Sequence, residues 1–400
     1  MNRRSLDCEL NSLVIFRSLL DDEIIKNFQF LLGLETDEVD CRVYNYSDFV
    51  SLLYKENVNF SEYILKRVLE NENLYIEGKA AGKQFDPVIE SAVENELKIL
   101  QELSQVTSAD VKKIISYDGF LPEWKTTPID LISEYRSRLE NVGQFGYGKF
   151  AKNAMFMLRK GEITPVNHPD PQRLSDLYGY KMERQAVINN TLALLKGKPA
   201  QNVLLYGDAG TGKSSTVKAV VNEFADKGLR LIEITKEQLR DIPDIIESIS
   251  SNPLKFIIFI DDLSFVAGED CFGALKATLE GSVSARTGNT AIYATSNRRH
   301  LVKESFSDRN GDDDVHRNDT LQETLSLSAR FGLRVNFSRP DKKAYVTIAT
   351  ELARSKGITL SDDELALKAE QFAISSGNGR SARTAKQFVA GLSQLDSSFE

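Results

Sequence analysis

The stretch NVLLYGDAGTGKSS, residues 202–215, runs from a short apolar segment through a glycine-rich loop into residues that favour a helix. The loop fits the pattern G-x-x-x-x-G-K-[ST], which in a strand–loop–helix context predicts a phosphate-binding loop. Its glycines let backbone N–H groups wrap phosphates, and the helix N-terminus adds a positive dipole. We expect Lys213 to reach the outer phosphates and Ser214 to offer its hydroxyl to Mg²⁺. The residues predicted to contact the phosphates are Gly207, Asp208, Ala209, Gly210, Thr211, Gly212, Lys213, Ser214 and Ser215.

A second group of polar residues follows the apolar run KFIIFI, residues 255–260, which ends in Asp261 and Asp262. A strand of a parallel sheet that ends in an acid places the carboxylate at the sheet edge where a phosphate loop also lies. We therefore expect Asp261 to hold Mg²⁺, mostly through water, and Asp262 to orient or deprotonate an attacking water. Without the upstream loop, the same two acids could simply cap the next helix.

Three further positions could contribute to such a site. Asn297 follows the run TAIYATS, and its amide could contact the outer phosphate or the water, although an Asn often caps a turn. Arg330 precedes a short strand pattern and could be a surface charge or an arginine finger for another subunit's nucleotide. Arg380 and Arg383 are neighbours at i and i+3 on one helix face. They could reach into the nucleotide cleft or be solvated.

Short β-branched or aromatic runs alternate with helical patterns from residue 176 onward. The runs at residues 202–206, 255–260 and 290–296 are apolar on both faces, which is typical of strands buried in a parallel sheet. The sequence thus predicts a doubly wound α/β domain over residues 176–339 and, after Pro340, a helical lid over residues 340–400. The predicted strands are residues 202–206, 229–235, 255–260, 290–296 and 333–337.

Residues 1–160 read as a mostly helical domain because apolar residues recur at spacings of three and four. Asp86 before Pro87 predicts a capped helix start. Residues 145–158 predict a bend followed by a core helix, and residues 161–175 contain three prolines and predict a linker, with His168 in a turn. The predicted helical stretches are residues 12–20, 23–32, 47–54, 62–69 and 87–103.

Composition places the chain among ordinary globular proteins, with 400 residues, 41% hydrophobic and 27% charged. The net charge of −8 is N-terminal, because residues 1–170 hold 20 Lys+Arg and 28 Asp+Glu whereas residues 171–400 hold 30 of each. This acidity disfavours nucleic-acid binding through that half. Cys8, Cys41 and Cys271 lack metal-ligand or disulfide spacing, so free thiols are expected. No apolar run reaches the roughly 18 residues of a membrane span, which predicts a cytoplasmic protein without a membrane partner.

Taken in order, these motifs resemble those of the AAA+ ATPases. The resemblance covers about 225 residues from Leu177 to the end. It identifies Gly207–Ser214 as Walker A, Phe256–Asp262 as Walker B, Asn297 as sensor 1, Arg330 as the arginine finger and Arg380 as sensor 2. The stretches 177–215, 258–265, 293–301 and 326–337 are most similar to an uncharacterised bacterial AAA+ group, domain of unknown function 815.

The resemblance implies that the nucleotide is ATP rather than GTP, that the cofactor is Mg²⁺ and that copies of the chain assemble into a ring or an arc, for example a hexamer. It also implies that Leu177, Tyr178 and Gly179 lie against the adenine.

Two features depart from the general AAA+ pattern. The acid after the Walker B Asp is Asp262 rather than Glu, one methylene shorter, as also seen in the branch of DnaA-like initiators and helicase loaders. Arg383 follows Arg380 by one turn, so either arginine could be sensor 2. In addition, the acid-rich stretch 305–319 predicts a mobile loop or a partner-contacting element.

These residues are compatible with three functions. The first is an oligomeric ATPase that hydrolyses ATP to ADP and phosphate, slowly or only when assembled, to remodel or load a protein partner bound by the N-terminal domain. The second is a helicase-loader-like or initiator-like binding switch with slow hydrolysis, for which Arg298 and Arg299 are the local basic cluster. The third, a small-molecule kinase, is disfavoured because such enzymes need neither a trans-acting arginine nor a helical lid of this kind.

Overall fold

The computed structural model describes residues 3–34, 38–264, 270–280, 288–297 and 327–396. It divides the chain into two compact units, Met1–Lys152 with Ser251–Pro253, and Asn153–Ser250 with Leu254–Glu400. Arg298, Arg299 and the acid-rich stretch 305–319 lie outside the described residues. Within the described residues, no helix combines the length and the apolar character needed to cross a membrane.

The N-terminal unit is helical, as predicted. Asp86 caps the helix that starts at Pro87 by accepting the backbone N–H of Val88. The core includes an aromatic cluster in which Phe28 and Phe49 contact Trp124, with ring centroids 6.3 and 5.2 Å away. The helices are α1 Arg3–Asn11, α2 Glu23–Gly33, α3 Val39–Glu56, α4 Phe60–Leu69, α5 Leu74–Ala80, α6 Pro87–Ser104, α7 Ser108–Ile115, α8 Leu131–Glu140, α9 Val142–Phe145 and α10 Gly148–Lys152, with the 3₁₀ turn η1 Arg17–Asp21.

The helix predicted over residues 12–20 is wrong. Residues 12–16 form turns and bends, and only the short η1 follows them. The reason is a long-range contact: the carboxylate of Glu96, 5% exposed on α6, accepts the backbone N–H groups of Val14, Ile15 and Phe16 at 2.9–3.1 Å. These donors are satisfied by a side chain 80 residues away in the sequence rather than by a helix.

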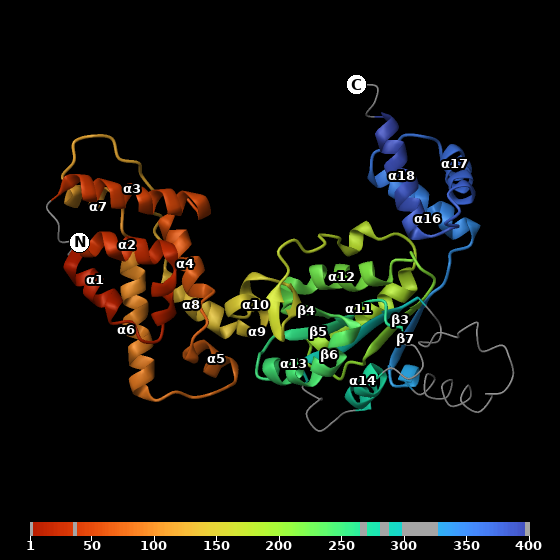
Figure 1. Ribbon diagram of the computed structural model, residues 1–400, viewed down its shortest axis with the longest axis horizontal. Coiled ribbons are helices and arrows are strands. Elements are labelled where there is room, and N and C mark those ends of the chain that lie inside the picture. Colours follow the sequence, from red (N-terminus) through yellow and green to blue (C-terminus); the bar gives the residue numbers. More distant parts are fainter. Residues whose placement is uncertain (1–2, 35–37, 265–269, 281–287, 298–326, 397–400) are drawn as a thin grey trace. The chain divides into compact units, whose positions relative to one another are not determined.

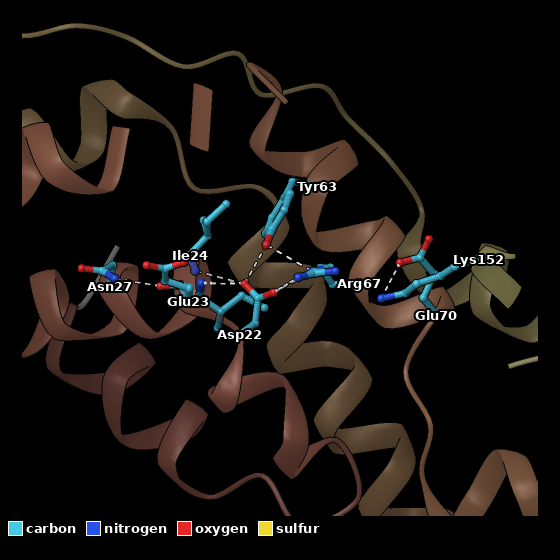
Figure 2. A network of polar contacts seen from close by, with 9 residues as sticks. Asp22, Glu23, Ile24, Asn27, Tyr63, Arg67, Glu70 and Lys152 are labelled. Atoms are coloured by element: carbon cyan, nitrogen blue, oxygen red, sulfur yellow. Dashed lines mark hydrogen bonds and ion pairs between the residues drawn. The ribbon is translucent and has the colours of Figure 1, made fainter. Parts of the chain in front are cut away.

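A buried polar network joins α2 to α4 (Figure 2). Asp22 caps α2 by accepting the N–H groups of Ile24 and Ile25, each at 3.1 Å. The same carboxylate accepts the Tyr63 hydroxyl at 2.7 Å and the Arg67 Nε at 2.6 Å. Burial and the hydrogen bond to Asp22 raise the pKa of Tyr63 above its ordinary value. The phenol therefore stays a donor, and the network fixes how the two helices meet.

The second unit is built on a sheet with the order β2-β1-β4-β5-β6-β3-β7 in the described part of the chain (Figure 1). All neighbouring strands pair in parallel except β1 and β2, which are antiparallel. The five predicted strands are confirmed. They are β3 Val203–Gly207, β4 Leu229–Ile234, β5 Lys255–Ile260, β6 Thr290–Ser296 and β7 Leu333–Phe337.

Residues 145–165 differ from the sequence prediction. After α10, the chain forms β1 Met155–Arg159 and β2 Glu162–Pro165 in place of the expected core helix and the first part of the expected linker. Met155 and Phe156 are buried, and β1 extends the sheet by pairing with β4. A five-residue apolar run carries no periodicity that separates strand from helix, so this tertiary pairing decides its conformation. The sheet-containing unit therefore begins at Asn153 rather than after residue 160.

Helices cover both faces of the sheet, with α11 Lys181–Leu195 and α12 Lys213–Phe224 on one side and α13 Ile242–Ile249 and α14 Asp270–Glu280 on the other (Figure 1). The predicted lid is also helical, with α16 Lys342–Ser355, α17 Asp362–Ser375 and α18 Ala382–Asp396 around a core of their own. The remaining 3₁₀ turns are η2 Leu174–Asp176, η3 Ala225–Lys227 and η4 Lys236–Asp241. The result is a mixed, mostly parallel α/β unit with a helical lid.

Candidate functional site

The glycine-rich loop connects the end of β3 to the start of α12. Gly207, Gly210 and Gly212 have φ angles of 129°, 77° and 94°, a range that favours glycine. A Cβ on Gly207 would lie 2.3 Å from the carbonyl oxygen of Phe337 in β7. Only glycine therefore lets the loop leave β3 beside β7 and turn over the start of the helix.

Lys213 is the first residue of α12 and is buried beneath the loop. Its Nζ donates to the carbonyl oxygens of Gly207 at 3.0 Å and Asp208 at 2.8 Å, and to the Oδ1 of Asn297 at 2.9 Å. Burial lowers the pKa of Lys213, while the charges of Asp262, Asp208 and Asp261 oppose that shift. Anions around a desolvated ammonium keep it charged, which suits a group that meets phosphates.

Asp261 accepts two hydroxyl hydrogen bonds on one oxygen. The Ser214 Oγ and the Thr295 Oγ1 each donate to the Asp261 Oδ1 at 2.5 Å. Among the described residues, no group of three or more His, Cys, Asp or Glu side chains could hold a metal. The Ser214 hydroxyl and the Asp261 carboxylate are hard oxygen ligands of the kind Mg²⁺ takes together with water and phosphates, so the residues fit that ion.

Asp262 points to a different partner from Asp261. Its carboxylate Oδ1 accepts the Asn297 Nδ2 at 2.7 Å, and its backbone N–H donates to the Thr295 Oγ1 at 2.9 Å. The chain is in the left-handed region here, with φ of 51°. Asp and Asn tolerate this region better than residues with longer or branched side chains. The backbone thus supplies a physical reason for an aspartate in place of the usual glutamate.

These side chains line one cleft of about 560 Å³, a volume typical of small-molecule sites. The structure brings residues 209–215 of the loop, with Asp261, Asp262, Asn297, Tyr178 and Arg383, to this cleft, whereas Gly207 and Asp208 do not line it. Leu177 and Tyr178, with Ile348 and Leu352 of α16, give it an apolar part. Gly179 packs closely under the lid, because a Cβ there would lie 2.7 Å from the Cδ1 of Ile348.

The two lid arginines have separate positions. Arg383 lines the cleft, and its backbone N–H donates to the Gly210 carbonyl oxygen at 3.0 Å. Arg380 forms a bidentate ion pair with Glu370 of α17, in which Nε and Nη2 donate to the two carboxylate oxygens at 2.9 and 2.8 Å. This pair holds the pKa of Glu370 below its ordinary value. Arg380 is thus engaged within the lid and does not line the cleft.

Arg330 does not line the cleft of its own chain. It lies in the turn before β7, and its backbone N–H donates to the Leu327 carbonyl oxygen at 3.1 Å. The position is compatible with the expected action on another subunit.

Four features in or beside the cleft were not expected from the sequence. Thr295 bonds both acids, and its signal was its place on β6 two residues before Asn297, because alternate residues of a strand share a face. The Asp208 carboxylate accepts the backbone N–H of Arg339 at 2.8 Å, which ties the loop to the base of the lid. Arg184 and Lys386 also line the cleft. Nothing in the sequence pattern separates these two residues from the other Lys and Arg residues of the chain.

Comparison with known proteins gives a consistent assignment. The chain matches the family described as "Protein of unknown function (DUF815)" over residues 144–395. It is 32% identical to the replication factor C large subunit of Staphylothermus marinus over 117 residues, 27% of each chain. It is 23% identical to an "AAA ATPase forming ring-shaped complexes" of Corynebacterium kroppenstedtii over 239 residues, 53% of this chain and 35% of that protein.

Two RuvB proteins are also similar. The Holliday junction branch migration complex subunit RuvB of Salinibacter ruber is 28% identical over 225 residues, 52% of this chain and 63% of that protein. The solved structure of the Thermotoga maritima RuvB branch migration motor covers 55% of this chain and 63% of its own, with 14% identity and a TM-score of 0.37. The chain spans less than two thirds of the length of each of these relatives.

The family match covers more than half of the chain, including the phosphate loop, both acids and the lid. One of the relatives is named as an AAA ATPase, and the sheet and lid have the architecture that the AAA+ resemblance implies. The chain therefore belongs to the DUF815 family and, with it, to the AAA+ ATPases.

Proposed function

We propose that this protein is an oligomeric ATPase that hydrolyses ATP to ADP and phosphate and uses the reaction to remodel or load a protein partner bound by its N-terminal unit. One observation carries the proposal: a continuous hydrogen-bond path runs from Lys213 through Asn297 to Asp262, beside the paired oxygens of Ser214 and Asp261. A phosphate-binding cation, a water-orienting carboxylate and a metal-binding pair thus meet at one sheet edge.

The reaction assigned to this site is in-line attack of water on the γ-phosphorus. Asp262 and Asn297 orient the water, and its proton passes to the Asp262 carboxylate or to the phosphate as the new P–O bond forms. The bond to the β–γ bridging oxygen breaks, and ADP carries that oxygen away. Lys213 and a neighbouring subunit's Arg330 face the charge that develops on the phosphate oxygens. When bound at Ser214 and Asp261, Mg²⁺ would neutralise part of the same charge.

Assembly is proposed because Arg330 does not line the cleft of its own chain. A site completed only by another copy works at full rate only in the oligomer, in a ring or an arc. The named ring-forming relative supports this expectation.

A second candidate, an ATP-controlled binding switch with slow hydrolysis, is favoured by one observation. Asp262 is one methylene shorter than glutamate and is already hydrogen-bonded to Asn297 at 2.7 Å. A shorter, engaged carboxylate activates water less well, so ATP could act mainly by changing the affinity for a partner. Hydrolysis that stays slow at every protein concentration, with ATP-dependent partner binding, would favour this alternative.

The test is ATP turnover measured across protein concentration, with ATP binding measured in parallel. Wild-type turnover per subunit should rise with concentration. Asp262→Asn and Arg330→Ala should bind ATP within about threefold of wild type but lose turnover by about 10²-fold or more. Arg334→Ala, an exposed arginine four residues further on in β7, is the matched control and should retain turnover. Full turnover by a dilute monomer would refute the trans-acting arginine, and absent ATP binding would refute the proposal as a whole.

A further inference from the structure

Arg184 is a cleft residue to which no role has been given so far. It lies on α11 one turn after Tyr180, whose carbonyl oxygen accepts the Arg184 backbone N–H at 3.0 Å. Its side chain is half-buried and lines the cleft with Leu177 and Tyr178. Across the described residues, the guanidinium makes no hydrogen bond or ion pair. Keeping a polar group partly desolvated without a partner is costly, which points to a ligand that supplies the missing contact.

The charges around Arg184 agree with this view. Burial lowers the pKa of Arg184, and the nearby charges of Glu183 and Glu351 oppose that shift without forming an ion pair at contact distance. The guanidinium stays charged at neutral pH, and the two carboxylates favour that charged form further. A charged, planar and weakly hydrated group thus lines the cleft without a hydrogen bond or ion pair to the described part of the protein.

The position of Arg184 sets which part of a nucleotide it can meet. The groups suited to phosphate and metal are Lys213, Ser214 and Asp261, on the loop side of the cleft. Leu177 and Tyr178 line the cleft just before α11, and Ile348 and Leu352 line it from α16. A nucleotide whose phosphates lie on the loop must turn its base and sugar toward this remaining, mostly apolar lining. Arg184 belongs to that side.

We propose that Arg184 recognises the base of the bound nucleotide, with the planar guanidinium packed against the ring face, and that it makes the site prefer purine to pyrimidine nucleotides. The inference rests on the proposed nucleotide-binding function and adds the residue that reads the base. Guanidinium groups stack on aromatic faces and are weakly hydrated, whereas a lysine ammonium is a compact, strongly hydrated charge. A purine offers a larger face than a pyrimidine, so the contact discriminates between the two.

Equilibrium binding to the full chain, measured by calorimetry with Mg²⁺ present, tests the proposal without relying on turnover. The ligands are ATP, CTP, 2′-deoxy-ATP and inorganic tripolyphosphate. Arg184→Met, which keeps the apolar stem, should lower the affinity for ATP and for 2′-deoxy-ATP about fivefold to thirtyfold. The affinity for CTP should fall less, and the affinity for tripolyphosphate should equal that of wild type. Arg184→Lys should restore little of the lost affinity for ATP. Lys181→Met, which removes a charge from the same helix outside this cleft, should change none of the affinities.

Several outcomes would overturn the proposal. An equal loss of affinity for all four ligands would mean that Arg184 acts as a distant charge on the phosphates. A loss of affinity for ATP without a loss for 2′-deoxy-ATP would place the contact on the ribose hydroxyl. Unchanged ATP affinity in Arg184→Met or Arg184→Lys, with either variant folded, would remove the contact altogether. If wild type binds tripolyphosphate but shows no purine preference, this inference alone fails. If wild type binds none of the four ligands, the proposed function fails with it.

Discussion

Asp262 combines two demands at a single residue. Its carboxylate must face Asn297 and the expected water, and its backbone must adopt φ of 51°. The left-handed region costs an ordinary residue roughly 1–2 kcal/mol, and Asp and Asn reduce that cost through local hydrogen bonds. Conformation and chemistry therefore restrict this position together, and a longer acid satisfies only the second demand.

This restriction predicts the effect of restoring the usual acid. Asp262→Glu should lower the free energy of unfolding by about 1 kcal/mol, because glutamate fits the left-handed backbone less well. Asp262→Asn should keep nearly the full stability, since Asn tolerates the same φ and can bond Asn297. Urea unfolding followed by circular dichroism measures both. A Glu variant as stable as wild type would show that backbone strain does not explain the aspartate.

At the scale of residues, the sequence predicted the groups that belong to contiguous motifs. The loop, Asp261, Asp262 and Asn297 could be placed because strands of one parallel sheet end at one edge, and the structure brings them together. Their roles in catalysis stay predictions. Arg184 and the Asp208–Arg339 contact could not be predicted, because each depends on packing between elements distant in the chain.

At the scale of elements, the lid helix α18 meets the phosphate loop directly. The Arg383 N–H bonds the Gly210 carbonyl oxygen, and a Cβ on Gly210 would lie 3.1 Å from the Cβ of Arg383. The lid start and the loop are thus in close contact before any nucleotide is considered. A shift of either element must alter the other.

Substitution of the two lid arginines, Arg380 and Arg383, should therefore have different effects. Arg383→Ala should raise the Kd for ATP about tenfold, because Arg383 lines the cleft beside the loop and we expect its guanidinium to pair with a phosphate there. Arg380→Ala should change the Kd less than twofold but lower the melting temperature slightly by breaking the pair with Glu370. Because that pair holds the pKa of Glu370 below its ordinary value of 4.5, its stabilisation is complete at pH 7 and is lost as the pH falls through the lowered pKa.

Calorimetric binding and melting curves at pH 7 and pH 4 measure the two effects. The melting difference between Arg380→Ala and wild type should shrink at the lower pH. A larger loss of ATP affinity in Arg380→Ala than in Arg383→Ala would contradict these roles and would indicate that Arg380 contacts the nucleotide.

The prediction of helices and strands succeeded where the apolar pattern of the sequence agrees with the packing in the structure. The five core strands and the lid helices follow from buried apolar runs and helical spacing. It failed at residues 12–20, where the Glu96 carboxylate takes the backbone donors, and at β1, where pairing with β4 decides between two conformations of a short apolar run. In both places the group that determines the conformation lies far away in the sequence. The local spacing of apolar residues therefore cannot predict it.

At the scale of the whole molecule, each compact unit has its own hydrophobic core. Trp124, the single tryptophan of the chain, is buried in the aromatic cluster of the N-terminal unit. Its fluorescence therefore reports the folding of that unit alone. Calorimetry, in contrast, records both units.

This arrangement predicts an asymmetric response to nucleotide. ATP at about 100 times its Kd should stabilise the unit that binds it by about 2.7 kcal/mol, which raises its melting temperature by several degrees. The fluorescence midpoint of Trp124 should stay in place. Lys213→Met should abolish the calorimetric shift and provides the control. A Trp124 midpoint that moves together with the calorimetric one would indicate that the two units unfold as one.

The path from Lys213 through Asn297 to Asp262 also fixes the direction of the central amide. The Asn297 oxygen faces a cation and its nitrogen faces an anion, so the reverse orientation would set like partial charges against each other at both ends. The three side chains to which the proposed reaction gives roles are consequently aligned by the folded chain itself. The rotamer entropy of ordering them, about 1–2 kcal/mol for a long side chain such as Lys213, is lost on folding and does not oppose nucleotide capture.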